Sequence, residues 1–253
     1  MAEAAGIQVW CEDEAGPYQT VPYAGYSWRP EQQPACQPHE YVRNGTAKLL
    51  TLFHPSSGQV RVKGVTDSTN ATLHDWLKAQ LTTILADQPL EMPPASDKAT
   101  NRLAWERWRE GVAVKATLPE VLPCLRLLLV MDNLVGHKNP EWLCWCFARG
   151  ILPIFTPLAG SWLNMAESIQ RLLKRRALNG TYPRTTNDII YQLEAVARVW
   201  NRQPTPFIWA GKRHARRTRA HLKRHPVGAS AATTPRPVCR RDAKWQGANQ
   251  MTH

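Results

Sequence analysis

The feature that most constrains the fold is an aliphatic run, Leu125-Arg-Leu-Leu-Leu-Val-Met131, which ends in Asp132 and Asn133. A strand with one face in water alternates apolar and polar residues, whereas this run is apolar at nearly every position. Such a strand is buried on both faces, so helices must cover both sides of its sheet. The sequence therefore predicts an α/β fold with a carboxylate at the end of a buried strand.

The rest of the chain supplies the other elements of such a fold. Further strands are predicted at residues 7–13, 46–53, 59–65 and 151–155. Turn residues at Pro55–Gly58 join the second and third of these as a hairpin, and Pro153 favours an edge position or a strand start for the last. Helical spacing of apolar residues predicts helices at residues 69–87, 101–111, 140–149, 162–178 and 186–200.

Three acidic residues occur where these elements begin or end. Asp13 closes the first strand, Asp132 closes the aliphatic run, and Glu167 follows after thirty-four intervening residues, at the head of a basic amphipathic segment. Singly, an aspartate at a strand end is more often a turn or cap residue. Together, carboxylates on neighbouring strand ends and on a helix across them can hold two Mg²⁺ or Mn²⁺ ions. Two such ions can drive cleavage and transfer of a phosphodiester.

The blocks around these acids resemble the catalytic domain of DDE-superfamily transposases, in particular the mariner-related bacterial insertion-sequence branch. The matching blocks are Asp13-Glu14-Ala-Gly16, Val130-Met-Asp132-Asn133 with His137, Ser161-Trp-Leu-Asn164-Met-Ala-Glu167 and Val199-Trp-Asn201. The resemblance covers roughly residues 7 to 210, and the thirty-four-residue gap is typical of that branch. Glu12 and Glu14 flank the first aspartate, but the family pattern of Asp followed by Glu favours Asp13.

The resemblance implies a ribonuclease-H-like mixed sheet flanked by helices over residues 1–210. The excess of Lys and Arg in residues 211–253 indicates a separate basic C-terminal arm. The resemblance makes Asp13, Asp132 and Glu167 the catalytic residues and the ligands of two Mg²⁺ or Mn²⁺ ions. The implied activity is DNA strand cleavage and strand transfer by a transposase. The implied partners are double-stranded DNA, as transposon ends and target, and further copies of the chain in a dimer or higher assembly.

The start of the chain departs from the family pattern. Members usually carry helix-turn-helix domains ahead of the first aspartate, and here only twelve residues precede Asp13. We therefore expect the catalytic half of a split transposase or a truncated copy. In the first case, a separate N-terminal DNA-binding chain would supply the recognition of transposon ends.

Several polar residues near the acids are candidates for supporting roles. Asn133 is expected to hold Asp132 or a metal-bound water, with a turn role as the alternative. His137 is expected to contact a DNA phosphate or a metal-bound water, with a capping or solvent-facing role as the alternative. Asn164 lies three residues before Glu167, on the same helix face, and is expected to hydrogen-bond a phosphate.

Basic residues follow the acidic set along the chain. Arg171, Lys174 and Arg175 lie four, seven and eight residues after Glu167, so on a helix they share its face. This arrangement suits a DNA backbone, although a solvated helix face is the alternative. Residues 211–253 carry eleven Lys and Arg against one acid, within a net charge of +12. We expect them to form an arm that is disordered without DNA and that binds phosphates, with a disordered tail that has no partner as the alternative. The candidate contacts in this arm are Lys212, Arg213, Arg216 and Arg217.

Composition and cysteine usage limit the cellular compartment in which the protein is expected. The six cysteines form no CxxC pair, and no apolar run is long enough to span a bilayer. We expect a cytoplasmic, nucleoid-associated bacterial protein with no membrane partner. Two alternatives stay open: a non-catalytic DNA-binding remnant of a transposase, and a structure-selective nuclease on the same fold. Metal-dependent joining of DNA strands would exclude both.

Overall fold

The computed structural model describes residues 2, 6–26, 29–34, 36–87, 98–112, 114–157, 160 and 163–207. All of these except Phe207 belong to one compact unit, Met1–Pro206. Outside the described residues lie the predicted contacts in the basic arm and the first part of the helix predicted from residue 162: Lys212, Arg213, Arg216, Arg217, Ser161 and Trp162.

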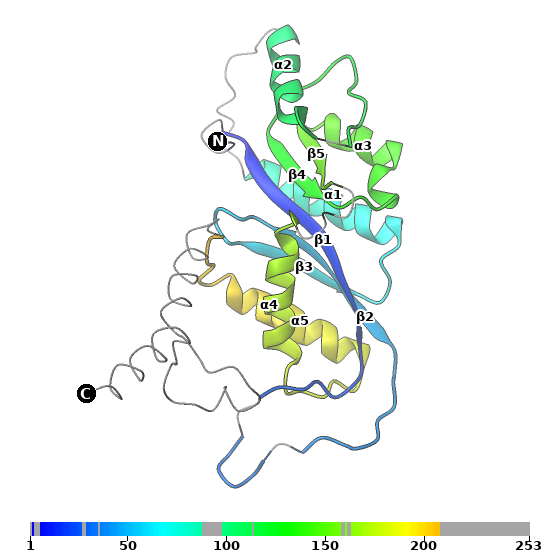
Figure 1. The fold of residues 1–253 in the computed structure, drawn as a ribbon, viewed down its shortest axis with the longest axis vertical. Helices are drawn as coiled ribbons and strands as arrows, with labels where there is room; N and C mark the ends of the chain where they lie inside the picture. The colour runs from blue at the N-terminus through cyan, green and yellow to red at the C-terminus, as the bar shows by residue number, and fades with distance from the viewer. Residues whose placement is uncertain are drawn as a thin grey trace, which may run out of the picture. The chain divides into compact units, whose positions relative to one another are not determined.

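One mixed sheet runs through the described part of the chain (Figure 1). Its strands are β1 (Gln8–Gln19), β2 (Thr46–Phe53), β3 (Val60–Val65), β4 (Leu127–Met131) and β5 (Ile151–Phe155). Their order is β3-β2-β1-β4-β5, with the first three antiparallel to one another and β4 and β5 parallel to β1. This confirms the α/β, ribonuclease-H-like mixed sheet that the sequence predicts, including the edge position of β5.

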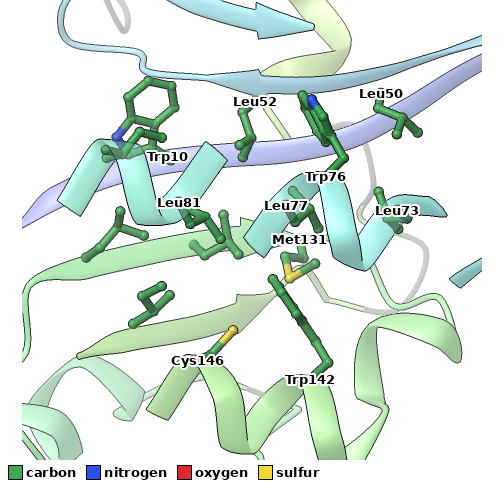
Figure 2. Packing of buried hydrophobic residues seen from close by; sticks show 14 of the residues in the cluster. Trp10, Leu50, Leu52, Leu73, Trp76, Leu77, Leu81, Met131, Trp142 and Cys146 are labelled. Carbon is green, nitrogen blue, oxygen red and sulfur yellow. The ribbon is translucent and has the colours of Figure 1, made fainter. Parts of the chain in front are cut away.

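Helices cover both faces of the sheet. They are α1 (Asn70–Ala86), α2 (Lys98–Arg109), α3 (Pro140–Phe147), α4 (Ala166–Leu178) and α5 (Thr186–Trp200), with a 3-10 turn, η2 (Gly136–Lys138). Helix α1 packs on one face together with α3 (Figure 2). On the other face, α4 crosses β1 and β2, and α5 lies against β2 and β3 (Figure 1). Within the described ranges, none of the helices has the length and apolar character of a membrane span.

Two apolar clusters explain the aliphatic run in β4. Leu127 and Leu129 belong to the cluster formed with α1 and α3, which Figure 2 shows around Trp76, Leu77 and Trp142. Leu128 belongs to a second cluster, which brings Trp105 of α2 against the alternate residues of β4 and β5. Successive side chains of a strand point to opposite faces. Because each face of β4 has its own apolar layer, every position in the strand must be apolar.

Strand β1 is longer than predicted. The sequence places its end at Asp13, whereas the strand continues to Gln19. Its pairing with β4 stops at Cys11, but its pairing with β2 continues to Gln19 across a register shift after Ala15. Gly16, with φ of +123°, provides the irregular backbone at that shift. The extension thus depends on the partner strand β2, which a local pattern cannot show.

Candidate active site

The two aspartates come from neighbouring strands. Strands β1 and β4 are parallel, and their last paired residues are Cys11 and Val130. Asp13 and Asp132 each lie two residues beyond that pair, so both follow the point where the pairing of β1 with β4 ends. Asp13 remains paired with β2, opposite Thr51. The two aspartates therefore lie on neighbouring strands, which is what converging carboxylates require.

Helix α4 brings Glu167 to the same end of the sheet. Glu167 lies in the first turn of α4. One turn further, the buried amide of Gln170 donates a hydrogen bond of 3.2 Å to the hydroxyl of Thr51, the strand residue opposite Asp13. This bond fixes α4 across β1 and β2. The fold therefore brings all three acids to the place where the pairing of β1 with β4 ends.

The helix begins later than predicted because of Asn164. Helix α4 starts at Ala166 rather than at residue 162. The Asn164 amide nitrogen donates to the backbone carbonyl of Glu12 at 2.5 Å, and its oxygen accepts from the N–H of Ala166 at 3.2 Å. An asparagine side chain that bonds the backbone in this way competes with helix formation. Asn164 is 2% exposed and joins the head of α4 to β1, while its predicted phosphate contact stays a prediction.

The pKa values of the two aspartates are shifted in opposite directions because their surroundings differ. Burial raises the pKa of Asp13 to about 7; the hydrogen bond from the Glu14 N–H lowers it, and the charges of Asp132 and Glu167 raise it further. Burial alone would also raise the pKa of Asp132. Hydrogen bonds from His137 and from the Leu134 N–H outweigh burial, and they hold that pKa below its ordinary value. The other two carboxylates thus contribute to the raised pKa of Asp13, after burial.

His137 lies inside the protein, so the solvent-facing alternative is wrong. Its side chain is 1% exposed, and its Nδ1 is 2.9 Å from Oδ1 of Asp132. Burial by itself would lower the pKa of His137. The hydrogen bond to Asp132 and the charges of Glu12 and Asp132 raise this pKa to about 9. His137 therefore supports Asp132 directly, while a contact with DNA or a metal-bound water stays a prediction.

Glu12 is the residue of this site that sequence reasoning missed. It is fully buried, and its Oε2 lies 3.5 Å from Nε2 of His137. Burial raises the pKa of Glu12 to about 8, against the lowering effect of the His137 charge. The signal was available: Glu12 lies inside a strand predicted as buried and next to Asp13, so strand alternation directs it to the opposite face.

Asn133 connects the ends of two strands. Its amide nitrogen donates to the carbonyl of Thr156, just beyond β5, while the Thr156 N–H donates to Met131 at 2.9 Å. Its Oδ1 is buried without a hydrogen-bond partner among the described residues. Asn133 thus secures the backbone that presents Asp132. Its predicted bond to Asp132 or to a metal-bound water stays a prediction.

The basic residues of α4 extend from the acidic end of the helix. Arg171 Nη2 lies 2.5 Å from Oε1 of Glu167, as expected for residues four apart on one helix face. Lys174 Nζ lies 5.9 Å from the ring centre of Tyr23, and Arg175 is exposed. Arg171 therefore shares a helix face with Glu167, as predicted, and its side chain is 76% exposed. Contact of this face with DNA stays a prediction.

The three carboxylates are suitable ligands for a hard divalent cation, although they are not arranged around a metal position in this structure. Carboxylate oxygens are the ligands that Mg²⁺ and Mn²⁺ favour. The charges of Asp132 and Glu167 disfavour ionisation of Asp13, and a bound cation would relieve this repulsion. Over the described ranges, however, no three Asp, Glu, His or Cys side chains stand close enough to hold a metal. Glu167 is instead paired with Arg171.

Comparison with known proteins agrees with this arrangement. Residues 8–190 match the family model described as DDE superfamily endonuclease, and the chain belongs to this family. None of the curated proteins matches it. A solved structure that resembles it is a chain of the simian T-cell lymphotropic virus intasome in complex with PP2A regulatory subunit B56 gamma, with 14% identity and a TM-score of 0.38. The match covers 74% of this chain and 46% of that chain, so this chain spans less than half the length of the intasome chain.

Proposed function

We propose that the chain is the catalytic domain of a metal-dependent DNA transposase, of the mariner-related bacterial insertion-sequence branch. One observation carries the proposal: Asp13 and Asp132 each lie two residues beyond the last pair of the parallel strands β1 and β4, and the charges of Asp132 and Glu167 raise the pKa of Asp13. The thirty-four residues between the last two acids support the branch. Such an enzyme would act on the nucleoid DNA of a bacterial cell.

The chemistry divides between the metal and the chain. Two bound Mg²⁺ or Mn²⁺ ions would activate the attacking oxygen and stabilise the leaving oxygen of a phosphodiester. Asp13, Asp132 and Glu167 would hold these ions. Asp132 is already aligned by His137, at 2.9 Å. Glu167 would exchange its contact with Arg171 for the metal, which frees the guanidinium to meet a DNA phosphate.

Double-stranded DNA is the proposed partner, both as transposon ends and as target. Arg171 and Arg175 are exposed on the helix that carries Glu167, and Lys174 lies between them. A row of cations that starts at the metal ligands can follow a phosphate backbone. We propose that the basic segment beyond residue 210 adds non-specific affinity. Assembly as a homodimer or larger complex on DNA, and a separate N-terminal chain for end recognition, belong to the same proposal.

The decisive experiment is nicking and strand transfer on supercoiled plasmid with Mn²⁺. The wild type is compared with Asp132→Asn and with Asp75→Asn, which makes the same charge change at an exposed position of α1. We expect nicked and joined products from the wild type and from Asp75→Asn. Asp132→Asn should lose both products, because it weakens a metal ligand while it keeps the shape of the side chain.

The outcomes separate the two alternatives. Cut ends without joined products would favour a structure-selective nuclease on the same fold. DNA binding without any product from the wild type would favour a non-catalytic remnant, provided that adding an N-terminal DNA-binding chain restores nothing. Equal activity of the wild type and Asp132→Asn would refute a carboxylate-metal mechanism.

A further inference from the structure

A fully buried carboxylate lies beneath the candidate active site. Glu12 is 0% exposed, and neither of its carboxylate oxygens has a hydrogen-bond partner among the described residues. Burying a carboxylate in this way is costly, and burial raises the pKa of Glu12 to about 8. An apolar side chain of similar size would fill the same space at lower cost. The position therefore requires an explanation other than packing.

The side chain that reaches Glu12 is His137. The imidazole Nε2 lies 3.5 Å from Glu12 Oε2, and Nδ1 lies 2.9 Å from Asp132 Oδ1. The ring therefore spans the distance between the buried carboxylate and a carboxylate of the candidate site. Each ring nitrogen faces one acid. A contact at Nε2 therefore also sets the orientation of Nδ1 towards Asp132.

The turn that carries His137 is itself fixed. Gly136 lies so close to Asn70 of α1 that an added Cβ would come within 2.2 Å of the Asn70 Oδ1. On the same helix, the His74 ring stacks on that of Trp142, with 5.1 Å between the ring centres. The backbone of η2 is thus held by α1. What remains to be fixed is the rotation of the imidazole ring, which Glu12 faces.

We propose that Glu12 is a positioning residue: it orients the His137 imidazole, which in turn orients the Asp132 carboxylate for metal binding. This inference rests on the proposed function of Asp132 as a metal ligand. Partners that orient a ligand from behind are commonly worth about 10- to 100-fold in metal affinity. Asp13 is placed directly by β1, whereas Asp132 would depend on this chain of two contacts.

A double-mutant cycle tests the inference without DNA. Mn²⁺ affinity is measured by electron paramagnetic resonance for the wild type, Glu12→Leu, His137→Gln and the double variant. We expect each single variant to bind Mn²⁺ about 10- to 100-fold more weakly, and the double variant to be no weaker than His137→Gln alone. Glu12→Gln, which keeps an acceptor oxygen, should stay within about threefold of the wild type. Independent, additive effects of the two substitutions would overturn the inference.

A second readout reports on the imidazole itself. The ¹⁵N resonances of His137 are recorded in the metal-free protein, where Glu12→Leu should change the Nδ1 and Nε2 shifts and Glu12→Gln should change them less. Unchanged shifts and unchanged Mn²⁺ affinity in Glu12→Leu would refute the positioning role. If Glu12→Leu does not fold, unchanged Mn²⁺ affinity in His137→Gln refutes it equally. If both shifts and affinity change but the wild type cleaves no DNA, the positioning role stands and the proposed function fails.

Discussion

The strongest test of the site geometry is the substitution Asn164→Ala. It removes two hydrogen bonds inside the protein: the 2.5 Å bond to the Glu12 carbonyl and the 3.2 Å bond from the Ala166 N–H. The Glu12 carbonyl lies just past the point where pairing of β1 with β4 ends at Cys11. Without the amide, this carbonyl and the N–H at the head of α4 lose their side-chain partner.

The expected magnitude follows from these two bonds. A hydrogen bond contributes about 1 kcal/mol net, and a buried group left unpaired costs about 1–3 kcal/mol. We therefore expect Asn164→Ala to lower the free energy of unfolding by about 2–4 kcal/mol. Because the same bonds place the start of α4, the position of Glu167 should also loosen, and metal-dependent activity should fall more than DNA affinity.

Urea denaturation followed by fluorescence measures the loss of stability. Ser168→Ala is the matched control, because its hydroxyl is exposed and bonds only within its own segment, to the Met165 carbonyl at 2.7 Å. The control should change stability by less than about 0.5 kcal/mol. If Asn164 acts instead through a phosphate, Asn164→Ala will match the control in stability and will reduce the salt dependence of DNA binding. That result would refute the positioning argument.

Three further predictions follow. Hydrogen bonds from backbone N–H groups at the start of α5 lower the pKa of Asp188 below 3.8. The charged form of Asp188 therefore stabilises the fold above that pH, and this contribution disappears as the pH falls through the folded-state pKa. In thermal melts, Asp188→Asn should be less stable than the wild type at pH 7, and the difference should shrink towards pH 3. Burial raises the pKa of the Cys11 thiol to about 12, so a thiol reagent should modify the exposed Cys36 in the native protein and Cys11 only after unfolding. Arg171→Glu and Lys174→Glu should each flatten the salt dependence of DNA binding by about 0.9 in log–log slope, and an unchanged slope would count against DNA contact by α4.

Elements with local signals could be predicted from the sequence. The strand at residues 46–53 and the helix at 186–200 have the predicted bounds, because side-chain patterning and a capping box define them within a few residues. The start of α4 could not be predicted in this way. It depends on a bond between Asn164 and Glu12, which are 152 residues apart in the sequence.

The same distinction holds for the candidate site. Residue type, spacing and the resemblance to DDE transposases selected Asp13, Asp132 and Glu167 as candidates, and strand order was needed to show that the first two lie on neighbouring strands. The burial of Glu12 was missed because a glutamate beside an aspartate suggests an exposed position. Only the apolar layer of α1 and α3 beneath β1 makes that position interior.

Strand β1 belongs to both halves of the sheet. It shares four residue pairs with β4, from Gln8 to Cys11, and then continues with β2 alone. Asp13 therefore lies on the stretch that is paired only with β2, whereas Asp132 follows directly on β4. The spacing between the two carboxylates thus depends on the short Gln8–Cys11 pairing, so we expect substitutions there to change this spacing without altering either acid.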